Sequence, residues 1–108
     1  MRALMSLTDN LETMLANGND SAMLRFGLGS AYFNEKDYQQ AITHLEKCIE
    51  RDNSYSSAYK LLRRAQIKLG LNERAKRTLA AGLEQSVLQG DKQTEREITV
   101  FLMKLDQR

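Results

Sequence analysis

The chain has 108 residues, enough for one domain with a modest hydrophobic core. Charged residues make up 28% of it and leave a net charge of +2, which is too small to indicate nucleic-acid binding by itself. One cysteine, Cys48, excludes an intrachain disulfide, and with a single histidine the chain has no cluster at metal-ligand spacing. No apolar run reaches the length of a signal peptide or a membrane span, so we expect a cytoplasmic protein without a membrane partner.

Apolar residues recur at helical spacing along the whole chain, and no segment shows the alternation of a β-strand. Asp20 or Ser21, then Asp37, Asn72 and Asp91, are suited to cap helix N-termini, where backbone N–H groups lack partners. In chain order the expected helices are residues 3–16, residues 21–34, a helix from about 38 broken at Asp52, residues 56–69, a helix from Asn72 closed by Gly90, and residues 91–106. The short connections predict antiparallel neighbours in one all-α domain, residues 1–108.

The pattern of residues 28–53 recurs 34 positions later, in residues 62–87. Leu28 corresponds to Leu62, and Ala41 to Ala75. This period is typical of helix–turn–helix repeats that bury their apolar faces only by stacking. The same offset places three residues of the first helix where the first copy has Ala41, Leu45 and Cys48; these residues are Leu7, Leu11 and Met14. The first helix therefore looks like the second helix of a repeat whose first helix is missing.

The residues Leu28-Gly29, Tyr32, Asp37-Tyr38, Ala41 and Leu45 resemble the motif of the tetratricopeptide repeat. The resemblance implies a right-handed α-solenoid with full repeats at residues 22–55 and 56–89, an N-terminal flanking helix at 3–16 and a C-terminal capping helix at 91–106. Three residues depart from the motif, namely Arg25 in the place of Trp, Arg63 in the place of Gly, and Gln66 in the place of Tyr. We expect Arg63 to run its stem along the surface and keep its guanidinium in water.

The resemblance also implies a non-enzymatic adaptor that holds a peptide or helix on the concave face, which the first helix of each repeat lines. By position in the motif, this face carries Phe26, Ser30, Phe33 and Asn34 in the first repeat and Lys60, Arg64 and Lys68 in the second. The three cations lie one turn apart on a helix without acids, so they favour an acidic peptide or a C-terminal carboxylate.

The alternative for these residues is that the cations form a solvated face and that Phe26 and Phe33 pack against the first helix. Lys60 and Arg64 also resemble two residues of the carboxylate clamp of some tetratricopeptide co-chaperones. However, Phe26 and Ser30 stand where that clamp has lysine and asparagine.

Two other functions stay open. Val100 and Met103 lie off the inner stripe of the last helix, which favours self-association through the terminal helices, for example into a homodimer. The basic segment 60–77 is a weaker argument for nucleic-acid binding, because Glu73 interrupts it and no aromatic residue there can stack on bases. Cys48 is expected in the core and His44 on a wet face, so we predict no catalytic residue, metal or cofactor.

Overall fold

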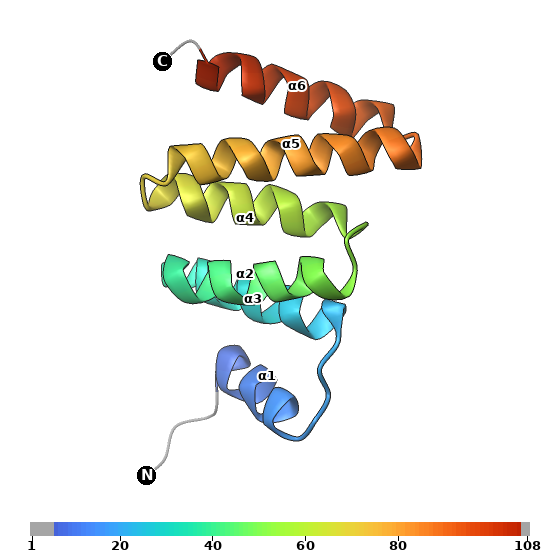
Figure 1. Cartoon of the computed structure of the whole chain (residues 1–108). Coiled ribbons are helices and arrows are strands. Elements are labelled where there is room, and N and C mark those ends of the chain that lie inside the picture. The colour runs from blue at the N-terminus through green and yellow to red at the C-terminus, as the bar shows by residue number, and fades with distance from the viewer. Residues whose placement is uncertain (1–5, 107–108) are drawn as a thin grey trace.

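The computed structural model describes residues 6–106, which form a stack of α-helices in chain order (Figure 1). Six helices span this part of the chain, namely α1 (Leu7–Ala16), α2 (Ala22–Asn34), α3 (Tyr38–Arg51), α4 (Ser56–Lys68), α5 (Asn72–Gln89) and α6 (Lys92–Asp106). The stack is elongated, 52 × 29 × 18 Å, with the two termini at opposite ends. The predicted fold class, an all-α array of antiparallel helices, is confirmed. Residues 3–5 of the first predicted helix lie outside the described part.

Polar residues cap three of the helices as the sequence predicts, namely α2, α3 and α6. Ser21 accepts a hydrogen bond from the backbone N–H of Leu24, and Asp37 accepts one from Gln40. At the start of α6, Asp91 accepts a hydrogen bond from the N–H of Thr94 at 3.1 Å. These side chains satisfy amides that the helix itself leaves without partners, so the boundaries are fixed locally.

The prediction that Asn72 caps α5 is wrong. Leu71 occupies the cap position and supplies no side-chain hydrogen bond, while Asn72 is already the first helical residue. The repeat itself points to Leu71, because this residue corresponds to the cap Asp37 of the first copy. The other end of α5 follows expectation, since Gly90 adopts a left-handed conformation with φ of 72°.

The core runs through α2, α3 and α4, where small residues let the helices approach closely. A Cβ atom on Gly29 would lie 2.6 Å from Cγ of Leu45, so α2 and α3 pack together only because Gly29 has no side chain. The fully covered side chains of this region include Leu28, Leu45 and Cys48. A second, smaller cluster joins Leu79 of α5 to Ile98 of α6.

The stack has an inner face that the first helix of each repeat lines. Besides its neighbours in sequence, the backbone of α2 also approaches that of α4, whereas in the described residues no Cα atom of α3 lies within 8 Å of one of α5, and these two helices meet through side chains such as Glu46 and Arg74. The first helices are therefore closer together than the second helices. This difference curves the stack and places α2 and α4 on its inner side. No helix in residues 6–106 is both long and apolar enough to cross a bilayer.

Candidate functional site

A cation lies over an aromatic ring where α2 faces α4. The guanidinium carbon of Arg64 is 4.8 Å from the ring centroid of Phe33, and the same ring meets Tyr38 edge-on at 5.2 Å. A cation over a ring face is attracted by the negative potential of the π-system. Phe33 therefore fixes the guanidinium of Arg64 on the inner face, although Arg64 as a whole stays exposed.

The other two predicted cations differ in their surroundings. Lys60 forms an ion pair with Glu97 of α6, with 3.5 Å between Nζ and Oε1, and both side chains are about half-exposed. The helix α4 contains no acid, as the sequence shows, but α6 supplies one. Lys68 is exposed at the C-terminal end of α4. Within residues 6–106, Arg64 and Lys68 have no acidic partner. Their charges are therefore more available to a ligand than the charge of Lys60.

The two phenylalanines lie at the edge of the core. Phe26 packs against Tyr55 with 5.1 Å between ring centroids, and both Phe26 and Phe33 are partly buried against the core of α3 and α4. This agrees with the alternative that the two rings pack in the core, although the contacts that the structure shows are to α3, α4 and Tyr55. The segment between α3 and α4 brings Tyr55 next to Phe26, whereas Phe33 meets Tyr38 of α3 and Arg64 of α4.

Ser30 and Asn34 lie elsewhere. They line an apolar groove of about 580 Å³ between α1 and α2, together with Leu7, Leu11, Met14, Met23 and Leu24. We call this the N-terminal groove. Of the seven predicted residues, the structure brings Phe33 and Arg64 into contact, whereas Ser30 and Asn34 border the N-terminal groove.

The expectation for Arg63 is also wrong. Its guanidinium carbon lies 4.0 Å from the ring centroid of Phe101 on α6, and its Nε is buried without a hydrogen-bond partner. Burial lowers the pKa of this arginine below its usual value. The residues around it enclose about 30 Å³ between α4, α5 and α6, which is room for a water molecule rather than for a ligand.

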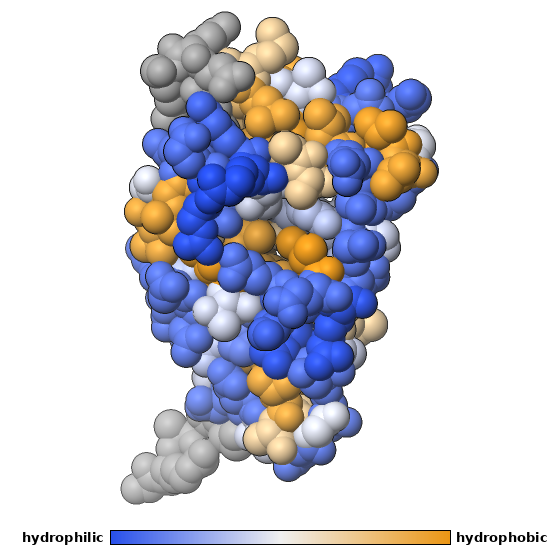
Figure 2. Space-filling view, in the orientation of Figure 1, coloured by the Kyte–Doolittle hydropathy of each residue, from blue (hydrophilic) through white to orange (hydrophobic). Residues whose placement is uncertain are grey.

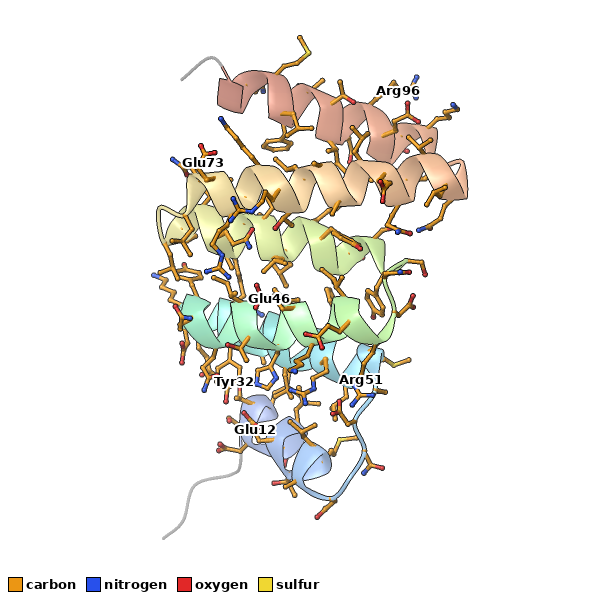
Figure 3. All side chains as sticks on the ribbon, in the orientation of Figure 1. Glu12, Tyr32, Glu46, Arg51, Glu73 and Arg96 are labelled. Atoms are coloured by element: carbon orange, nitrogen blue, oxygen red, sulfur yellow. The ribbon has the colours of Figure 1, made fainter. Side chains whose placement is uncertain are left out.

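A polar cluster that the sequence did not predict attaches α1 to α2 and α3 (Figure 3). Tyr32 donates a hydrogen bond to Glu12, and the ring of Tyr32 stacks on His44 with 5.5 Å between centroids. Arg25 donates to Nδ1 of His44 at 3.0 Å and forms two hydrogen bonds with Asp20. His44 is only 6% exposed, so the prediction of a wet face is wrong. The available signal was Arg25, a charged residue in the place of a buried Trp.

The cluster shifts the pKa values of its members in directions that suit a structural role. Burial is the main cause that lowers the pKa of His44, and the donated bond from Arg25 requires Nδ1 to be unprotonated. The hydrogen bond to Glu12 raises the pKa of Tyr32 to about 12, and the guanidinium of Arg25 lowers the pKa of Asp20. The cluster therefore has a neutral histidine between fixed charges, not a poised acid or base.

The basic segment 60–77 does not form one patch. Arg63 points to Phe101 of α6, whereas Arg74 pairs with Glu46 of α3 at 3.0 Å. Lys76 forms an ion pair with Glu73 at 3.7 Å. The positive charges of this segment therefore spread over different sides of the stack, and several are already compensated by acids.

The comparisons with known proteins agree on the family. Residues 32–89 match the tetratricopeptide repeat family. The chain is 45% identical over 100 residues to the TPR repeat-containing protein PA0015 of Pseudomonas aeruginosa, covering 93% of this chain and 95% of that protein.

Solved structures show the same arrangement. Protein BPP2914 from Bordetella parapertussis is 34% identical, with a TM-score of 0.79 over 96% of this chain and 90% of that chain. The TPR2B domain of yeast Sti1, in complex with pHsp70, is 23% identical with a TM-score of 0.80 over 93% and 80% of the two chains, which shows the fold alone. The chain therefore belongs to the tetratricopeptide repeat family.

Proposed function

We propose that this protein is a non-enzymatic adaptor that binds an acidic peptide segment of another protein on the inner face of α2 and α4. The observation that carries the proposal is the guanidinium of Arg64 stacked on Phe33, with Lys68 one turn further along the same helix face. Stacking on Phe33 leaves the edge of the guanidinium free to donate two parallel hydrogen bonds to a carboxylate. The partly buried rings of Phe26 and Phe33 offer apolar contact beside these charges.

The spacing of the cations favours an extended ligand. Lys60, Arg64 and Lys68 follow each other every four residues, which is a rise of about 6 Å along an α-helix. Side chains on one face of an extended peptide recur about every 6.8 Å. A peptide with acidic residues at alternate positions, or with one such residue next to a C-terminal carboxylate, would therefore match two successive cations.

Arg64 and Lys68 are the main determinants in this proposal. At Lys60 a ligand carboxylate has to replace Glu97, whereas Arg64 and Lys68 lack an acidic partner in the described part of the chain. The complex of the Sti1 domain with pHsp70 is an example of this fold with a bound partner. The proposal includes action in the cytoplasm, as the sequence predicts.

Fluorescence anisotropy with a labelled peptide of alternating aspartates, and with its asparagine counterpart, tests the proposal. The Arg64→Glu/Lys68→Glu variant should weaken aspartate-peptide binding more than about tenfold, because each charge-assisted hydrogen bond contributes about 1.5–3 kcal/mol. The matched control is Lys47→Glu/Arg77→Glu, which changes the net charge equally at exposed positions of α3 and α5. Equal loss in both variants, or equal binding of both peptides by the wild type, would refute a specific site on the inner face.

A further inference from the structure

The N-terminal groove exposes a stripe that the same molecule buries in its next repeat. Ala41, Leu45 and Cys48 are fully covered, because α2 packs on them as the first helix of their repeat. Their counterparts on α1 are Leu7, Leu11 and Met14, of which Leu7 is 65% and Met14 44% exposed. Nothing within residues 6–106 takes the place of a first helix here. The groove therefore has the shape to accept a helix antiparallel to α1.

At the C-terminal end of the stack, a first helix is present and its second helix is missing from the described residues. Helix α6 packs on α5 in the position of a first helix, and in the described residues no second helix follows behind it. Val100 and Met103 on α6 are 49% and 59% exposed. Figure 2 shows apolar side chains at the surface over α6 and again around α1, at the two ends of the molecule. Within residues 6–106, the N-terminal end has no first helix and the C-terminal end presents one, so the two ends are complementary halves of a repeat.

Charge is also distributed unequally between the ends. Residues 6–35 contain four acids, Asp9, Glu12, Asp20 and Glu35, against the single base Arg25. Helix α6 at the other end contains three bases, Lys92, Arg96 and Lys104, against three acids, Glu95, Glu97 and Asp106. On α6 itself, Lys92 and Arg96 are exposed near Val100. Two copies of the acidic N-terminal end therefore repel each other, whereas α6, which has as many bases as acids, does not oppose the approach of that end.

We propose that the protein associates with itself head to tail, with α6 of one copy seated in the N-terminal groove of the next copy. The contact completes a repeat from two chains and covers the apolar residues of both ends. It joins two different surfaces, so it continues from copy to copy and does not close as a symmetric dimer. The inner face of α2 and α4 takes no part, which makes this association independent of peptide binding.

A complementation experiment tests the direction of the contact. The head variant is Leu7→Glu/Met23→Glu and the tail variant is Val100→Glu/Met103→Glu; all four residues are exposed, so both variants should fold. Sedimentation velocity of the wild type should show a mean mass that rises with concentration beyond that of a dimer. Each variant alone should stay monomeric. An equimolar mixture should form heterodimers and stop there, because only one intact head and one intact tail remain to pair.

The control variant Leu69→Glu/Leu88→Glu changes two exposed apolar residues outside both surfaces and should assemble like the wild type. A wild type that stays monomeric up to millimolar concentration overturns the proposal. A dimer that only one of the two variants abolishes indicates a symmetric contact and also overturns it. Circular dichroism of each variant establishes that the helical content is unchanged. Binding of the aspartate peptide should be equal in the head and tail variants. This measurement separates failure of the self-association proposal from failure of the peptide-binding proposal.

Discussion

Two glycines of α2, two positions apart, should respond in opposite ways to the same substitution. A Cβ atom at position 29 would lie 2.6 Å from Cγ and Cδ2 of Leu45, a side chain with no exposed surface into which it could move. At position 27 the nearest atom would be Cδ1 of Leu11 at 3.5 Å, which is an ordinary contact distance. We therefore expect Gly29→Ala to destabilise the protein and Gly27→Ala to stabilise it.

The magnitudes follow from two terms. Replacing a helical glycine by alanine favours the helix by about 1 kcal/mol at either position. At Gly29 the added methyl group also overpacks the core, which costs about 1–3 kcal/mol or more. A contact of 2.6 Å requires α2 and α3 to separate, so the upper part of that range applies. Gly29→Ala should then be less stable than Gly27→Ala by about 2–3 kcal/mol.

Urea unfolding followed by circular dichroism measures this difference, provided that the dependence of the unfolding free energy on urea is the same in all variants. Gly82→Ala serves as an intermediate case, because its Cβ would lie 3.3 Å from Ile98 and Tyr59. Equal stability of Gly27→Ala and Gly29→Ala would refute the reasoning. It would mean that the close approach of α2 and α3 does not depend on the missing side chain.

Three further predictions concern charge and burial. Glu97→Gln should tighten binding of the aspartate peptide up to about fivefold by freeing Lys60 from an exposed ion pair, and an unchanged or weaker anisotropy-derived Kd would contradict this. Because the pKa of His44 is lowered on folding, the unfolded chain binds a proton that the folded chain does not as pH falls below about 6.5. Stability should therefore decrease below this pH and decrease less in His44→Gln, as urea midpoints at pH 7.5 and 5.5 would show. Burial raises the pKa of the Cys48 thiol to about 11, so a thiol reagent should react at the rate of unfolding, and fast labelling of the native protein would contradict this burial.

The sequence predicts the helices and their stacking well because a small number of residues dictate them. Gly29 and Ala41 leave the space that Leu45 fills, and the same spacing recurs with Ala75 and Leu79 in the second copy. Such constraints are local, since each pairs a helix with its neighbour in the chain. A self-match at an offset of 34 residues therefore carries enough information to assign α2 to α5 and their order.

The sequence fails where a side chain is covered by a helix outside the self-match. His44 is buried by Tyr32 together with residues of α1, and Arg63 is covered by Phe101 of α6. The bounds of α6 were predicted within one residue, but not the side chains that it covers, because α5 has 18 residues whereas α3 has 14 and the repeat offset no longer holds after α5. Two of the predicted binding residues also lie against a helix outside the self-match. Ser30 and Asn34 border the groove beside α1.

The order of contacts in the stack has a consequence for how the molecule opens. Helix α1 packs on α2 and reaches α3 through the contact of Glu12 with His44, whereas α3 packs on both α2 and α4. No packing between distant helices links the two ends within residues 6–106, so local unfolding at one end need not involve the other. Amide hydrogens of α1 should thus exchange with solvent when this helix detaches from the stack. Those of α3 should exchange only when α3 separates from α2 and α4. Protection from hydrogen exchange should therefore decrease from the central helices to the end helices. An end helix is then the part of the molecule that a helix of another copy can most easily replace.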